Sequence, residues 1–142
     1  MKKVLSFVLV LAMILGSVSM VFAKEFSDVK AGDDYEEAIS TLSDLGVIDG
    51  YTDGSFKPDA IVTRGQMAKL LVSALGLKTS AAGTTTNYPD VPSTSVYSGY
   101  IKYATELGIV KGYTDGTFKP DKQVTADEAI TMTVRALGYN DE

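Results

Sequence analysis

The chain has 142 residues and contains neither cysteine nor histidine. Without cysteine no disulfide framework can form, and without histidine the chain lacks the commonest general base and the commonest zinc ligand of proteins. Any catalytic chemistry would have to rest on carboxylates, in a chain whose length suits one modest domain. We therefore expect that the protein is not an enzyme and that it uses no cofactor.

Basic residues are also in short supply. The sequence holds 13 lysines and arginines against 18 aspartates and glutamates, which gives a net charge of -5 at pH 7. Proteins that bind nucleic acid usually present a basic surface to its phosphates. The charge balance argues against nucleic acid as a partner.

A long apolar run lies at the N-terminus. Two lysines follow Met1, apolar residues then continue almost unbroken to Leu15, and small residues lead up to Ala23. This pattern predicts a secretory signal peptide over residues 1–23. An uncleaved anchor is the alternative, because about 20 apolar residues can span a bilayer. We expect cleavage, secretion, and no membrane association of the mature chain.

The rest of the sequence is a tandem repeat. The segment at residues 50–59 reads GYTDGSFKPD, and it returns 62 residues later, at residues 112–121, as GYTDGTFKPD. A fixed offset of this kind marks two copies of one unit. A small polar run separates the copies and is typical of a linker. The predicted parts are a first repeat at 24–78, a linker at 79–86 and a second repeat at 87–142.

Each repeat is expected to begin with a helix. In the first repeat the apolar residues follow a helical spacing of three and four, with Asp33 or Asp34 available as N-cap and Gly46 as a left-handed stop. The second repeat keeps this phase and stops at Gly108. We expect both apolar faces to lie in the core, which the two copies share. The first face consists of Tyr35, Ala38, Ile39, Leu42 and Leu45.

A structured loop follows each of these helices. An Asp-Gly pair, at Asp53 in the first repeat and at Asp115 in the second, predicts a tight reversal of the chain. Pro58 is expected to fix its own φ and to hold the preceding Lys57 in an extended conformation.

A second helix begins after each loop. Thr63 with Gln66, and Thr125 with Glu128, have the spacing of a capping box, in which the two side chains satisfy each other's backbone amides. Each repeat is therefore predicted to be helix, loop, helix, and the fold class to be all-α.

Arg64 is unusual because it occupies the first position of its helix, where the macrodipole disfavours a cation. One interpretation is a solvated surface arginine. The other is that Arg64 meets an anionic ligand, since the free amides of a helix start also favour an anion. Together with Thr63, and with Tyr51 and Lys57 of the preceding loop, Arg64 would form a site of the size and chemistry of an acidic sugar.

The carboxylates suggest two other kinds of site, a calcium site and a hydrolytic site. Asp49, Asp53 and Asp59 suggest calcium, but the loop lacks the ligand spacing and the closing acidic residue of a calcium loop, so turn formation explains them better and no metal site is predicted. A glycan hydrolase would need two carboxylates about 5–10 Å apart. Nothing in the spacing of Asp28, Asp53, Asp59 and Glu128 selects a pair.

The order of these elements, from the FSDV of residues 26–29 to the closing Ala-Leu-Gly of the second helix, resembles the S-layer homology (SLH) repeat. The resemblance implies non-covalent attachment of a secreted protein to the bacterial cell wall or S-layer. The implied ligand is an anionic, pyruvylated secondary cell-wall polysaccharide. The implied fold is a pseudo-threefold helical bundle with ligand grooves between repeats, of which two repeats form a part. The alternative function is a self-associating or protein-interaction module of the envelope without a glycan site.

The resemblance also implies site residues. The family's binding motif, Thr-Arg-Ala-Glu or a variant, maps onto residues 63–66. The implied ligand-binding set is Arg64, Thr63, Gln66, Tyr51, Lys57 and Asp59. In the second repeat the arginine position holds Ala126 and the next holds Asp127, which would repel a carboxylate. Gly65 in place of the family's alanine is expected to leave more room beside Arg64.

The number of repeats departs from the family, which usually works with three. Stacked repeats generally need about three units to cover their apolar faces. Leu71, Ile130 and Val134 are therefore not all expected to find cover within one chain. The bundle could be completed by self-association or by a third repeat from another chain. Alternatively, the chain is a truncated module, or two repeats suffice with an exposed flank.

Overall fold

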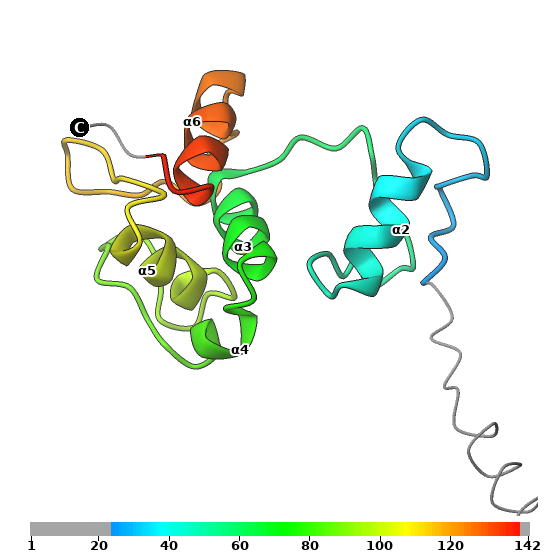
Figure 1. Cartoon of the computed structure of the whole chain (residues 1–142). Helices are drawn as coiled ribbons and strands as arrows, with labels where there is room; N and C mark the ends of the chain where they lie inside the picture. Colours follow the sequence, from blue (N-terminus) through cyan, green and yellow to red (C-terminus); the bar gives the residue numbers. More distant parts are fainter. Residues whose placement is uncertain (1–23, 140–142) are drawn as a thin grey trace, which may run out of the picture.

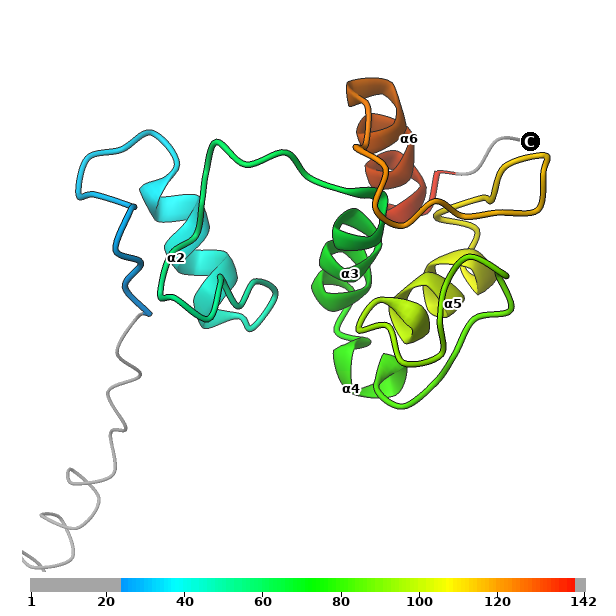
Figure 2. The same ribbon diagram turned by 180° about the vertical axis from the view of Figure 1, so that it is seen from behind.

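The computed structural model describes residues 24–139, so the predicted signal peptide lies outside the described residues. Figures 1 and 2 show a purely helical arrangement, and the only strand-like pairing among residues 24–139 is one isolated bridge between Thr63 and Gln123. This confirms the all-α class. The helices are α2 (Glu36–Asp44), α3 (Arg64–Ala74), α4 (Lys78–Ala81), α5 (Ser98–Glu106) and α6 (Ala126–Ala136).

The second helix of each repeat begins as predicted. Thr63 accepts a hydrogen bond from the amide of Gln66, whose side chain accepts one from the Thr63 amide, and Thr125 with Glu128 does the same at α6. These capping boxes satisfy amides that a helix start otherwise leaves free. The two α-helical starts are therefore fixed by local sequence.

The start of α2 differs from the prediction. Its N-cap is Tyr35, which makes no side-chain capping bond. Asp33, predicted as a cap, instead accepts a hydrogen bond from the amide of Lys30 at 2.8 Å. The stop is as predicted, because Gly46 has a φ of 69° in the left-handed region that glycine adopts without strain.

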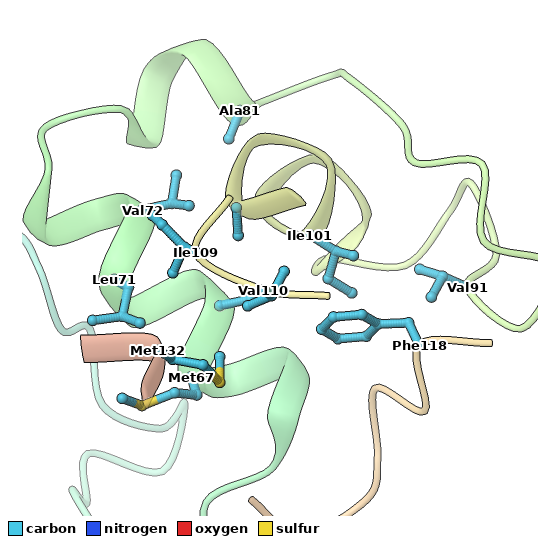
Figure 3. Packing of buried hydrophobic residues seen from close by; sticks show 12 residues of the cluster. Met67, Leu71, Val72, Ala81, Val91, Ile101, Ile109, Val110, Phe118 and Met132 are labelled. Atoms are coloured by element: carbon cyan, nitrogen blue, oxygen red, sulfur yellow. The ribbon is translucent and has the colours of Figure 1, made fainter. Parts of the chain in front are cut away.

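The hydrophobic core joins the two repeats, as expected. α3 of the first repeat packs along α5 of the second, with α4 against both (Figure 1). Figure 3 shows the ring of Phe118 reaching from the second loop into this cluster. The packed unit thus begins in the middle of the first repeat. Its buried members are Met67, Ala68, Leu71, Val72, Ala81, Val91, Ile101, Ala104, Ile109, Val110, Phe118 and Met132.

α2 does not share this core. Within the described part of the chain it packs against no other helix. Ile39 is its one buried residue, whereas Tyr35 and Leu45 are exposed. The expectation that the whole apolar face of this helix is core is therefore wrong for the first repeat. The same expectation holds better for the apolar face of α5, where Ile101 and Ala104 are fully buried, because α5 packs against α3.

Two glycines let backbones approach closely. A Cβ on Gly99 of α5 would lie 1.9 Å from the carbonyl oxygen of Ala81 in α4, so α4 packs closely on α5. The linker predicted at residues 79–86 therefore begins inside a helix, because α4 spans Lys78–Ala81. A Cβ on Gly65 would lie 3.0 Å from the ring of Tyr97. The space that glycine leaves beside Arg64 is therefore filled by Tyr97.

The loops are held by an aspartate near the start of each repeat. Asp28 accepts hydrogen bonds from the amides of Phe56 and Lys57, both at 2.7 Å. Lys57 has a φ of 61°, so the expectation of an extended conformation before Pro58 is wrong. The carboxylate of Asp28 and an ion pair between Lys57 and Asp53 at 3.1 Å stabilise this left-handed conformation.

Candidate binding groove at the junction of the repeats

Arg64 lies buried between the two repeats, with an exposed fraction of 5%. Its Nε donates to the carbonyl oxygen of Phe118, Nη1 to the carboxylate of Glu128 and Nη2 to the carbonyl oxygen of Lys111, each at 3.0 Å. The guanidinium carbon lies 4.7 Å from the ring centroids of both Tyr113 and Phe118. The interpretation of Arg64 as a solvated surface residue is therefore wrong. Arg64 ties its helix to the loop of the next repeat.

The backbone at the start of α3 is also used by the second repeat. The amide of Arg64 donates to the carbonyl oxygen of Lys122, and that of Gly65 to Pro120, both at 2.9 Å. In return, the amide of Val124 donates to a first-repeat carbonyl at 3.0 Å. The amides that could have bound an anion at this helix start are satisfied by protein carbonyls.

Glu128 is the negative charge that faces Arg64. It accepts hydrogen bonds from Arg64, from the hydroxyl of Tyr113 at 2.9 Å and from the amide of Thr125 at 3.0 Å. Partial burial acts to raise the pKa of Glu128, but these hydrogen bonds and the charge of Arg64 outweigh it and hold the pKa below its usual range. The junction therefore contains an ionised pair near neutral pH.

Acid should weaken this junction. The pKa of Glu128 is lower in the folded protein than its unfolded value of 4.5, so the ionised carboxylate stabilises the fold at any pH above 4.5. This stabilisation is lost as the pH falls through the pKa of the folded protein. Near neutral pH we expect Glu128→Gln to lower the free energy of unfolding by about 1.5 kcal/mol. Melting curves from about pH 6 down to about pH 3 should show this difference shrinking.

The matched control for this measurement is Glu25→Gln, at an exposed glutamate outside the junction. It removes the same charge and should leave the melting temperature close to that of the wild type at every pH. A difference between wild type and Glu128→Gln that stays constant down to the acid limit would show that the ion pair contributes nothing to stability.

A groove of about 240 Å³ opens beside this junction. Lys111 and Arg135 contribute cationic side chains, and Asp127 and Glu128 contribute carboxylates. A cation can meet an acidic substituent, while carboxylates accept hydrogen bonds from hydroxyl groups. The full lining is Arg64, Val110, Lys111, Asp127, Glu128, Thr131, Met132 and Arg135.

A second, larger cavity of about 360 Å³ borders the second loop at Gly116. Lys102 lines it and is 3.9 Å from Glu106, which lines it too. Threonines from the segment between the repeats complete much of its wall. Arg64 does not line this larger cavity but does line the smaller groove, so the smaller groove is the candidate site.

Both repeats match a known family. Residues 25–68 and residues 87–130 each match the S-layer homology domain. The chain belongs to the SLH family. Its relatives include the surface layer protein of Brevibacillus choshinensis, with 42% identity over 98% of this chain, and the middle cell wall protein of Brevibacillus brevis, with 41% identity over 98%. The cellulosome-anchoring protein of Acetivibrio thermocellus is 37% identical over 62% of this chain.

The SLH chain covers only a small part of these relatives, namely 13%, 14% and 20% of their respective lengths. The family and the names of the relatives support a location outside the cell, in the cell wall or surface layer. They point to an anchoring or structural role rather than a catalytic one. Among the described helices, none has both the length and the apolar character needed to cross a membrane.

Three of the carboxylates considered for hydrolysis, Asp28, Asp53 and Glu128, have structural partners. Asp28 holds two loop amides, and hydrogen bonds from the side chain and amide of Ser55 lower the pKa of Asp53 to about 2. A general acid of a glycosidase needs the opposite, a raised pKa. In the described part of this SLH chain, no group of three or more acidic side chains is arranged to hold a metal ion.

The structure places the six predicted ligand-binding residues in two groups. Thr63, Arg64 and Gln66 lie together at the start of α3, and Arg64 is the one of the three that lines the groove. Tyr51 and Lys57 lie in the first loop, with the lysine Nζ 4.3 Å from the centre of the tyrosine ring. Asp59, near the end of that loop, is exposed.

The aromatic and charged partners of Arg64 come from the following SLH repeat. The sequence suggested Tyr51 of the preceding loop as a neighbour of Arg64, whereas the tyrosine ring that Arg64 contacts is Tyr113, one repeat later. Lys111, Glu128 and Arg135 were not predicted to be part of the site. The offset of 62 residues could have suggested Tyr113, since it is the repeat equivalent of Tyr51.

Proposed function

We propose that this SLH chain attaches non-covalently to the bacterial cell wall by binding an anionic glycan in the junction groove. The pyruvylated secondary cell-wall polysaccharide implied by the family is the proposed ligand. The observation that carries the proposal is the groove itself, where cationic and hydrogen-bonding side chains meet beside the family's arginine. The membership of both repeats in the family supports it.

The groove offers distinct partners to the two parts of such a ligand. Lys111 and Arg135 would meet the carboxylate of a pyruvate group, and Asp127 and Thr131 would accept from or donate to sugar hydroxyls. Arg64 has five N–H donors, of which the three hydrogen bonds to the second repeat use three. Its role in binding would be to build the groove wall and to offer the remaining donors.

The other predicted residues have different proposed roles. Thr63 and Gln66 act through their capping box, which fixes the helix start that carries Arg64. Tyr51, Lys57 and Asp59 would form a separate contact for the same polymer on the first loop. An exposed tyrosine ring beside a lysine suits a sugar face with an acidic substituent.

Lys111→Ala is the sharpest test of the groove. It removes a cationic side chain but keeps the backbone carbonyl that Arg64 uses, so the fold should be unchanged. Loss of a charged hydrogen bond should weaken binding to purified cell walls by about tenfold or more. Lys102→Ala, in the larger cavity, is the matched control and should bind like the wild type.

Walls from which pyruvate has been removed chemically serve as the second arm. The wild type should bind these walls much more weakly, and the Lys111→Ala variant should lose little further affinity on them. Wall binding that is unaffected both by Lys111→Ala and by removal of pyruvate would contradict the proposal. It would leave a protein-interaction role without a glycan site as the better account.

A further inference from the structure

The junction between the repeats has two halves, and each half occurs twice in the chain. One half is the start of α3, and the other is the second loop with α5. At the offset of 62 residues, the start of α6 repeats the first half, and the loop at residues 49–60 with α2 repeats the second. Within the described chain, α6 packs on α3 and α2 packs on no helix. One copy of each half therefore lacks, within the described chain, the kind of partner that its other copy has.

The free face of α6 is apolar. Ile130, Val134 and Leu137 lie on successive turns and are 62%, 41% and 71% exposed. The equivalent positions of Ile130 and Val134 in α3 are Ala68 and Val72, which are fully buried in the core that α3 forms with α5. The exposed stripe of α6 thus has the position that α3 uses for packing. Such a stripe marks an interaction surface.

The charges that would meet in a second junction are matched to each other. In the observed junction Arg64, at the start of α3, pairs with Glu128, at the start of α6 of the following repeat. At the equivalent positions of a second junction, the arginine is replaced by Ala126 and the glutamate by Gln66, which lies at the start of α3 in the same repeat as α2. Both partners of the ion pair are absent together. The oxygen of Gln66 is already used by the amide of Thr63, so an arginine placed there would lack a carboxylate.

The side-chain volumes are matched as well. Tyr100 and Tyr103 of α5 pack against the shared core, in which α3 contributes the small Ala68. Their equivalents in α2 are the smaller Ala38 and Thr41, both exposed, while Ala68 is replaced by the larger Ile130. A larger residue on one helix opposite smaller ones on the other preserves the packed volume.

We propose that the free face of α6 binds the first repeat of a second copy of this chain, in the same geometry in which α3 binds the second repeat. The amides of Ala126 and Asp127 would donate to carbonyl oxygens in the loop of the second copy, as those of Arg64 and Gly65 do within the chain. The second copy is the occupant that fits, because its first repeat presents a neutral glutamine opposite Ala126. Such a head-to-tail contact uses two different surfaces.

Sedimentation of the purified chain starting at Lys24 tests this proposal directly. Association should appear as the concentration rises from the micromolar to the near-millimolar range, and the melting temperature should rise with it. Ile130→Asp should abolish both effects, while Val96→Asp, at another exposed valine, should not. A monomer throughout, or association that Ile130→Asp leaves unchanged, would overturn the proposal.

A double-mutant cycle identifies the contact itself. Ala126→Arg together with Gln66→Glu should rebuild across the interface the pair that Arg64 and Glu128 form within the chain. We expect association of the double variant to be about tenfold tighter than that of the wild type. Ala126→Arg alone should weaken it, since the arginine then lacks a carboxylate. Strictly additive effects of the two changes would show that these positions do not meet, and would also overturn the proposal.

Discussion

Replacing Arg64 with alanine is expected to lower the free energy of unfolding by about 3 kcal/mol, the lower end of the cost of removing one partner from a buried ion pair. Arg64 is 5% exposed, and its loss would leave the carbonyl oxygens of Phe118 and Lys111 without their donor. The two rings that contact the guanidinium would border a cavity. A change of this size should lower the melting temperature by roughly 10 °C or more.

Arg64→Lys is the matched control, because it keeps the charge and loses the planar group that makes three hydrogen bonds at once. Its stability should fall between those of the wild type and the alanine variant. Wall binding should fall together with stability in both variants, so a loss of binding does not by itself place Arg64 on the ligand. An alanine variant that melts like the wild type would show that the buried contacts of Arg64 are dispensable.

Replacing Asp90 with alanine should have the second-largest effect, about 2–3 kcal/mol, because a partly buried amide and an exposed amide would lose their common acceptor. The carboxylate accepts from the amides of Phe118 at 2.9 Å and Lys119 at 2.6 Å. These bonds together outweigh the partial burial that acts to raise the pKa of Asp90, and they hold it below its usual range. The loop that they fix carries Phe118, which is fully buried in the core.

Asp28→Ala is the natural comparison, since Asp28 makes the same two hydrogen bonds in the first repeat. Its loop carries Phe56, which lies outside the shared core. Thermal melts should therefore show a clearly smaller effect for Asp28→Ala than for Asp90→Ala. Hydrogen exchange should speed up at the amides of Phe118 and Lys119 in the Asp90 variant. Equal effects of the two variants would mean that the loops contribute equally to global stability.

These expectations depend on a difference between the two loops that is not visible in their nearly identical sequences. The segments 49–59 and 111–121 differ at only two of eleven positions, yet only the second surrounds an arginine and contributes a fully buried phenylalanine. The difference comes from which helix start lies against each loop. No local signal in the sequence specifies that partner.

Local signals were reliable where their physics is local. Capping boxes, left-handed glycine stops and the helical spacing of apolar residues act over a few residues, and the helices at Thr63 and Thr125 begin where these signals place them. The cap of α2 was missed because Asp33 has a competing acceptor role in the preceding turn. The left-handed Lys57 was missed because its amide is held by Asp28, 29 residues away.

The sequence by itself determined the all-α class, the two repeats and the family, because composition, caps and spacing are properties of short segments. It also identified Arg64 as exceptional, from its unfavourable position at a helix start. Only the tertiary structure decided what Arg64 contacts, namely a carboxylate, two carbonyls and two rings of the next repeat. The reason is that a buried cation is satisfied by whichever acceptors the packing of distant segments provides, and two nearly identical loops offered the same acceptors.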